Sequence, residues 1–295
     1  MAAAAPEAVG GQALVEGVMM RRGSRWAAAV RQPDGFIVTE RRDLPPSLDR
    51  ARRWPLVRGV LALGESVVLG TTAMAWAART REPDKGAGYS SGGVAVSTLL
   101  AALLAVAAFG LGPGAAAKAL GIDGRLAFNL AEGLIRLGLL FGYLWLLSRS
   151  AAARRVFAFH GAEHMTIHAY EHGEPLVPER IRTFDRRHPR CGTSFLLLVV
   201  IVSIAVHVLI GTPGWAVFVA SRLIGLPLVA ALAYELVRAT GRHGTSWFGR
   251  VITAPGSWLQ SITTREPDDD QIEVAVAALQ ATLDAPADLD VAGVH

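Results

Sequence analysis

The stretch GTSFLLLVVIVSIAVHVLIG, residues 192–211, decides the class of fold, because it is apolar over almost its whole length. A helix needs roughly 20 such residues to cross a bilayer. Residues 212–214, Thr-Pro-Gly, allow no more than a turn, and residues 215–237 are again apolar. The sequence therefore predicts two transmembrane helices joined as a hairpin.

Two more apolar segments, residues 93–111 and 131–147, predict a second pair of spans. Leu56–Ala78 is also long enough to cross a membrane, but it contains Arg58 and Glu65. A charge within a span is costly unless it faces protein or water. We expect this segment to be an amphipathic helix on the membrane or on the bundle, with spanning as the alternative.

Arginine residues orient the predicted spans. Residues 150–191, the first eighty residues and the tail are rich in arginine, whereas residues 112–130, which we expect to form an outer loop, carry few basic groups. Basic residues stay on the cytoplasmic side. We therefore expect a multi-pass protein of the cell (inner) membrane, with both termini and residues 150–191 in the cytoplasm.

Composition agrees with a membrane protein. The 295 residues are 52% hydrophobic, with mean hydropathy +0.35 and net charge +4. The basic balance follows from topology, and we see no nucleic-acid recognition motif. A single cysteine excludes a disulfide within the chain, and residues 1–6 lack the basic start and apolar core of a signal peptide.

The predicted cytoplasmic parts mix strands and helices. Residues 26–31 and 36–41 flank Gln-Pro-Asp-Gly at 32–35, which predicts a β-hairpin. Acidic residues at 266–270 predict the start of a final helix, which we expect to pack on the cytoplasmic part. The fold class is thus mainly α: a polytopic helical membrane protein with about four spans, an amphipathic helix and a small mixed α/β cytoplasmic part. We divide the chain into segments 1–55, 56–92, 93–149, 150–191, 192–237 and 238–295.

Candidate chemistry lies in residues 157–191. His160 and His164 are four residues apart, so on a helix they reach one point in space, and Glu163 borders the same face. The order His-x-x-Glu-His is that of inverted zincins, in which the histidines bind zinc and the glutamate is the general base. Glu171, His188 and Cys191 lie further along and can reach the same place.

Four stretches of the chain are distinctive in combination: Gly10–Met19, Phe159–His164, His188–Phe195 and Trp258–Asp269. Together they resemble the bacterial YqhQ-like family, a domain of unknown function described as a predicted metal-dependent enzyme. The likeness covers nearly the whole chain and implies a multi-pass membrane protein. It supports as site positions His160, Glu163, His164, Glu171, His188 and Cys191, and it does not require His168 or His172.

Three hypotheses follow. The first is a metal-dependent hydrolase with zinc on His160 and His164, a third ligand from Glu171 or His188, Cys191 as a fourth, and Glu163 as base. Its substrate would be a lipid head group or a peptide near the membrane. The second is a non-catalytic assembly, insertion or scaffolding factor that contacts lipids and other membrane proteins and has a structural metal site. The third and weakest is transport, based on charged or titratable residues in or beside spans: Glu132, Arg136, His207, Arg222 and Glu235.

Overall fold

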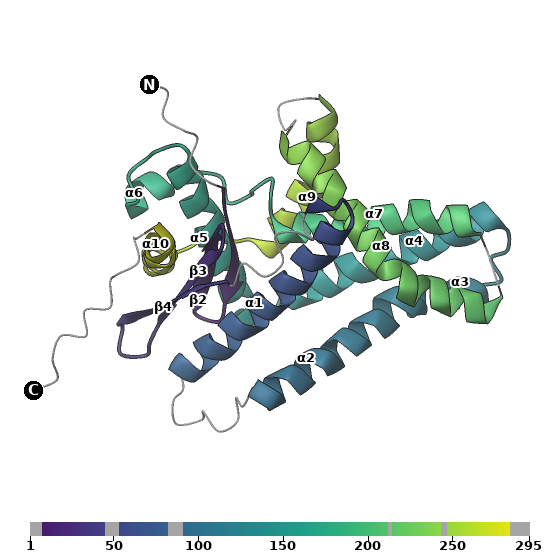
Figure 1. Cartoon of the computed structure of the whole chain (residues 1–295), viewed down its shortest axis with the longest axis horizontal. Helices are drawn as coiled ribbons and strands as arrows, with labels where there is room; N and C mark the ends of the chain where they lie inside the picture. The colour runs from purple at the N-terminus through teal and green to yellow at the C-terminus, as the bar shows by residue number, and fades with distance from the viewer. Residues whose placement is uncertain (1–7, 45–52, 82–90, 212–213, 243–246, 284–295) are drawn as a thin grey trace, which may run out of the picture.

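The computed structural model describes residues 8–44, 53–81, 91–211, 214–242 and 247–283. A bundle of long helices forms one part of the molecule, and a four-stranded sheet with its covering helices forms the other (Figure 1). The strands are β1 (Val9–Leu14), β2 (Gly17–Arg22), β3 (Arg25–Arg31) and β4 (Ile37–Asp43). The helices are α1 (Val57–Arg81), α2 (Ser91–Ala105), the π-helix η3 (Val106–Leu111), α3 (Gly112–Ala119), α4 (Arg125–Leu147), α5 (Ala151–Glu171), α6 (Pro178–Ile181), α7 (Gly192–Ile210), α8 (Trp215–Arg242), α9 (Trp247–Thr263) and α10 (Asp269–Leu283).

The sheet is an antiparallel meander in the order β1-β2-β3-β4. The hairpin predicted around residues 32–35 is confirmed as β3 and β4, with Val30 opposite Val38. The segment before it forms a further hairpin, because Val15 and Glu16 make a two-residue turn between β1 and β2. Glu16, the second residue of this turn, adopts a positive φ of 56°.

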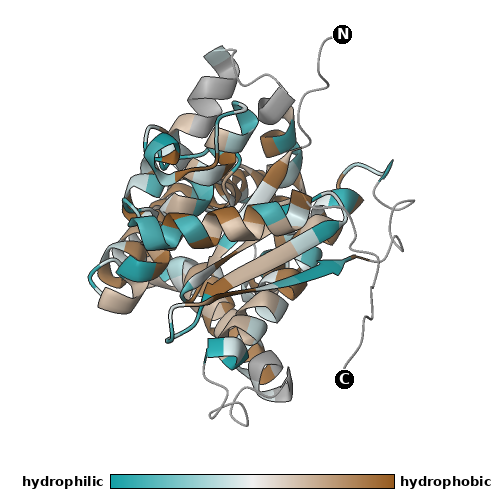
Figure 2. Cartoon of the chain, turned by 90° about the vertical axis from the view of Figure 1, so that its left-hand side faces the viewer, coloured by the Kyte–Doolittle hydropathy of each residue, from teal (hydrophilic) through white to brown (hydrophobic). Residues whose placement is uncertain are grey.

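Each face of the sheet is covered by helices, so the central strands β2 and β3 are largely buried on both sides. Val18, Met20 and Ala29 point toward α5 and α10 and form one core with their apolar residues. Their neighbours along the strands point the other way and pack on the second half of α1. Figure 2 views this end of the molecule and shows hydrophilic and hydrophobic residues mixed along the elements there.

The last helix is placed as the sequence predicted. The side chains of Asp268 and Gln271 each accept a hydrogen bond from the other's backbone N–H, at 2.9 and 3.1 Å, which forms a capping box at the start of α10. Ile272, Val274 and Leu279 are fully buried against the sheet and α5. Helix α10 therefore belongs to the core on one face of the sheet, and α1 to the core on the other.

The bundle contains the predicted spans. Among the described residues, helices long and apolar enough to cross a membrane number five: α1, the run Val96–Ala119, α4, α7 and the α8 segment Trp215–Ala239. This confirms a mainly α, polytopic membrane protein. The loop expected over residues 112–130 is much shorter, because the helix continues through η3 and α3 and α4 already begins at Arg125. Pro113 lies in the first turn of α3, where a proline needs no helical hydrogen bond.

Helix α1 joins the two parts of the molecule. Its first half packs on α8, where Gly59 lies so close to Ala231 that an added Cβ would be 2.9 Å from the Ala231 Cα. Its second half buries Leu69, Ala73 and Ala77 against the sheet. The helix meets the length and apolarity of a span, and it also packs on the bundle and the sheet as the sequence favoured.

Candidate metal centre

Helix α5 carries the candidate site on one of its faces. It begins after Ser150, whose backbone is extended, and ends at His172, followed by Gly173 with φ of +69°. A glycine in this left-handed conformation is a common end of a helix. Because the helix is continuous between these ends, His160 and His164 stack one turn apart, with ring centroids 4.3 Å apart.

The segment that precedes α7 folds back onto this face. The side-chain amide of Gln260, in α9, bonds both to the backbone N–H of His188 at 2.7 Å and to its carbonyl at 2.9 Å. Cys191 is the N-cap of α7, and its Sγ accepts from the Thr193 N–H at 3.4 Å. This bond fixes the Cys191 Sγ at the start of α7.

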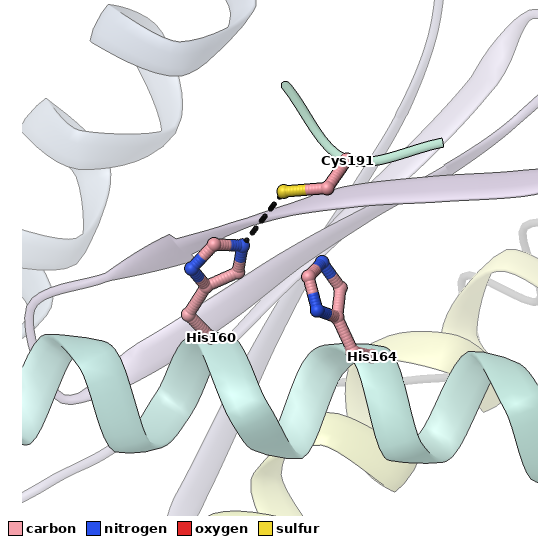
Figure 3. Close-up of side chains that lie close together, drawn as sticks. All are labelled: His160, His164 and Cys191. Atoms are coloured by element: carbon pink, nitrogen blue, oxygen red, sulfur yellow. Dashed lines mark hydrogen bonds between the residues drawn. The ribbon is translucent and has the colours of Figure 1, made fainter. Parts of the chain in front are cut away.

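Three side chains converge at this place: His160, His164 and Cys191 (Figure 3). One donor atom from each lies within 4.8 Å of the others, and the Nε2 of His160 is 3.2 Å from the Cys191 Sγ. Nitrogen and sulfur ligands on a tetrahedral zinc lie about 3.5 Å apart, given bond lengths of about 2.0 and 2.3 Å. The spacing of the thiol and imidazole therefore fits such an ion.

Backbone carbonyls orient both imidazoles. The Nδ1 of His160 lies 2.9 Å from the Thr263 carbonyl, and the Nδ1 of His164 lies 2.6 Å from that of Arg186. A carbonyl only accepts, so each Nδ1 donates its N–H, and Nε2 is the ring atom left to bind a metal. Metal-ligating histidines are usually held in this way.

Glu163 is buried beside this triad with 4% of its surface exposed. Burial raises the pKa of its carboxyl to about 7, although the nearby His160 opposes the rise. Its Oε2 has no hydrogen-bond partner among the described residues. Its Oε1 faces Gly11 of β1, where an added Cβ would lie 2.8 Å away. Glycine at this position therefore lets the strand and the carboxylate approach each other.

Glu171 and His188 form a neighbouring pair outside the triad. Glu171 is bonded to Arg190, and its other oxygen lies 3.6 Å from the Nε2 of His188, which is too long for a hydrogen bond. Burial raises the pKa of Glu171, but His188 and Arg190 outweigh it and lower the value to about 2. Burial lowers the pKa of His188 to about 4 against the influence of Glu171. The ring of His188 is 5.6 Å from that of His164.

The two histidines that the sequence left outside the site have other contacts. The Nε2 of His168 bonds to the Arg187 carbonyl at 3.0 Å, and the Nδ1 of His172 bonds to the His168 carbonyl at 2.8 Å. His172 is exposed. Neither belongs to the triad.

A cavity of about 720 Å³ opens onto the triad. Its walls come from β1, α1, α5 and residues 188–193, and Glu163 lines it together with His160, His164 and Cys191. Binding sites for small molecules commonly have volumes of about 300–1,000 Å³. The donor set therefore faces a space that can admit a substrate.

Several residues that shape the site carry no metal-ligand signature. Gln260 and the carbonyls of Thr263 and Arg186 position the ligands, and Gly11 makes room for Glu163. Gly11, Gln260 and Thr263 belong to the stretches on which the resemblance was based. Three of the four stretches thus line one cavity, and the fourth holds His160 and His188 from behind through Thr263 and Gln260.

Comparisons with known proteins agree with that resemblance. Residues 54–285 match the family described as "Protein of unknown function (DUF1385)". The chain is 32% identical over 299 aligned positions to the protein named "Uncharacterized protein YqhQ" from Bacillus subtilis (strain 168), and the alignment covers 94% of this chain and 93% of that protein. No solved structure matches the chain. The identity over almost the full length of both chains and the family match together show that this chain belongs to the YqhQ-like DUF1385 family.

Proposed function

We propose that this membrane protein is a metal-dependent hydrolase whose zinc is held by His160, His164 and Cys191. The observation that carries the proposal is the convergence of these three donors, with both imidazoles oriented by carbonyls, at the wall of a large cavity. Catalytic zinc sites use three protein ligands and leave a position open, whereas structural sites use four. Zinc is the proposed divalent metal because thiolate and imidazole are both ligands that it prefers.

Glu163 is the proposed general base. A zinc ion at the triad would supply Lewis acidity and lower the pKa of a coordinated water to about 7. In the metal-free protein burial raises the pKa of Glu163 to about 7, and a bound zinc would lower it from there. A general base works best when its pKa is near the operating pH, so this starting value suits a group that takes a proton from water and returns it to a leaving group. Its unpartnered Oε2 is the atom assigned to carry that proton.

The edge of the sheet favours a peptide as substrate. β1 is an edge strand, and Gly10 and Gly11 in it line the cavity. Alternate residues of an edge strand turn their N–H and C=O groups outward. The Val9 carbonyl contacts Arg190 outside the sheet at 3.5 Å, which marks Val9, Gly11 and Ala13 as the outward positions. An extended segment could pair with them as an added strand beside the metal.

The site is proposed to act at the cytoplasmic face of the cell membrane. The arginine-rich segments expected on that side include residues 150–191, which contain α5 and the ligand loop. Cys191 is the N-cap of the apolar helix α7, so the site lies next to the N-terminal end of a candidate span. A substrate would therefore be a lipid-facing or membrane-adjacent segment of another protein.

A second candidate function is a structural metal site in an assembly or scaffolding factor. Its support is His188, which is 3% exposed and whose ring lies 5.6 Å from that of His164. A small movement would let its Nε2 become a fourth ligand and close the coordination sphere. The two candidates differ in whether one metal position stays open.

Metal content tests both candidates at once. We expect full-length protein purified in detergent to hold about one zinc per chain. The double variant His160→Ala/His164→Ala should lose it, because both nitrogen donors are removed. The matched control, His168→Ala/His172→Ala, changes the same residue type on the same helix and should keep the metal. Zinc-free wild-type protein, or equal zinc in both double variants, would contradict the assignment.

Cobalt substitution then separates catalysis from structure. A thiolate-to-cobalt charge-transfer band should appear in wild-type protein and disappear in Cys191→Ser. Acetohydroxamate, which chelates a metal that has an open position, should shift the d–d bands of the wild-type complex. No shift in wild-type protein combined with a shift in His188→Ala would assign His188 as a fourth ligand and refute the hydrolase.

A further inference from the structure

A buried ionic cluster lies among the membrane helices, away from the metal centre. The Glu132 carboxylate pairs with Arg136 at 2.6 Å and also with Arg222, and all three side chains are at most 7% exposed. In the described part of the chain, Glu132 is the sole carboxylate that pairs with either arginine. Two guanidinium groups and one carboxylate leave one positive charge without a counterion.

Such a surplus charge is expensive to keep inside a membrane protein. Charged groups within spans are typically paired or face a functional cavity. Arg222 has its Cζ 4.2 Å from the centre of the Phe218 ring, and this cation–π contact only partly replaces a counterion. The cluster is therefore suited to receive an anion.

A cavity of about 400 Å³ adjoins the cluster. Arg136, Ser203, His207 and Arg222 line it, and its other wall residues are apolar except for Tyr143. On α7 it extends from His207 to Leu196, which corresponds to about 16 Å at a rise of 1.5 Å per residue. The cavity is thus long and mostly apolar, and its polar groups lie chiefly at one end.

His207 supplies an independent indication of a ligand. It is 5% exposed, and neither ring nitrogen has a hydrogen-bond partner within the described residues. A buried imidazole without partners is costly unless something else occupies the adjoining space. The wall opposite includes the π-helix η3, and Arg136 bonds to its Phe109 carbonyl at 2.6 Å. Isolated π-helical turns are frequent at functional sites.

We infer that this cavity binds a long-chain fatty acid. Its carboxylate lies at Arg136, Arg222 and His207, and its chain follows the apolar wall toward Leu196. One negative charge matches the surplus charge of the cluster, and the cavity volume is near the lower end for ligand sites, which suits one chain rather than two. Leu196 also lines the metal cavity, so the chain's methyl end, not its carboxylate, approaches the metal. The bound acid is therefore a ligand and not a substrate of the triad.

Photolabelling of the full chain in detergent with a diazirine analogue of palmitate tests the inference. We expect the label on cavity-lining peptides of α4, α7 or α8. Palmitate should compete, while hexadecanol, which has the same chain without the charge, should compete about tenfold more weakly. Equal competition by hexadecanol would show that the carboxylate plays no part and that apolar chains pack there adventitiously, which would overturn the inference. Stronger competition by phosphatidylglycerol than by palmitate would show that the ligand is a phospholipid and would refute the assignment of a fatty acid.

Two neighbouring substitutions locate the bound chain. Val200→Trp fills the cavity without touching the charged cluster and should reduce labelling about tenfold. Ile201→Trp is the matched control, because Ile201 is the next residue of α7, is 42% exposed and does not line the cavity. Unchanged labelling in Val200→Trp would refute the placement. If Val200→Trp fails to fold, the competition series in wild-type protein still decides the matter.

Discussion

Replacing Glu163 by glutamine should change how the stability of the metal-free protein depends on pH. Glutamine keeps the size of the side chain but cannot ionise. Glu163 is buried, and one of its oxygens lacks a hydrogen-bond partner among the described residues. Its charged form is therefore less stable in the folded state than in the unfolded chain.

The magnitude follows from the pKa. The folded-state pKa of Glu163 is raised from 4.5 to about 7, which at 1.36 kcal/mol per pKa unit corresponds to about 3 kcal/mol. Because the pKa is raised, the stabilising contribution is complete below pH 4.5 and is lost as the pH rises through 7. His188 has the opposite dependence: its lowered pKa of about 4 gives a contribution that is lost as the pH falls from 6.5. It is present in both proteins, so the comparison of wild type with Glu163→Gln cancels it.

Unfolding in detergent with a chelator, measured between pH 4.5 and 8, provides the assay. Stability of wild type relative to Glu163→Gln should fall across this range by about 3 kcal/mol. Zinc should reduce that difference, because a divalent cation at the triad stabilises the carboxylate. Parallel stability curves for the two metal-free proteins would refute the claim that burial raises the pKa of Glu163 to about 7.

Two other predictions concern residues that hold the site together. Gln260→Leu leaves the backbone N–H of His188 without a partner, while its C=O keeps the bond from the Cys191 N–H at 3.3 Å. Unfolding should therefore become easier by about 1–3 kcal/mol, and zinc affinity should fall, as titration calorimetry can measure. Gly161→Ala brings a Cβ into overlap with the Arg265 carbonyl and should lower the melting temperature. Gly173→Ala lies at the helix end, where an added Cβ meets no atom within 4 Å. It should lower the melting temperature through backbone strain at φ +69° alone. Equal zinc affinity in Gln260→Leu and wild type, or an unchanged melting temperature in Gly161→Ala, would contradict these assignments.

The sequence predicted those parts of the fold whose signals are local. Apolar length identified the helices, the Gln-Pro-Asp-Gly turn identified β3 and β4, and the acidic run identified the start of α10. It failed at residues 112–130, where glycine, proline and charged residues suggested a loop. Pro113 is compatible with a helix start, and the π-helical segment η3 connects α2 to α3 without a loop. Sequence periodicity contains no signal for such a segment.

Prediction of the site was limited in another way. The spacing of His160, Glu163 and His164 is fixed by the helix, so their common face followed from sequence. The place of Cys191 depends on the fold of residues 182–191, which Gln260 and backbone carbonyls determine. Sequence alone could not tell whether Glu171 or His188 would be a third donor, and the structure pairs them beside the triad instead.

The location of the donors links the metal to the joint between the two parts of the molecule. His160 and His164 belong to α5, which packs on the sheet, whereas Cys191 caps α7 in the bundle. A metal that binds all three would therefore tie a membrane helix to the sheet part. Ligands that bind only the folded state stabilise it in proportion to the logarithm of their concentration. Zinc should thus stabilise the contact between α5 and α7 whether or not the site hydrolyses a substrate. Metal content alone therefore does not distinguish a hydrolase from a structural metal site, whereas an open coordination position does.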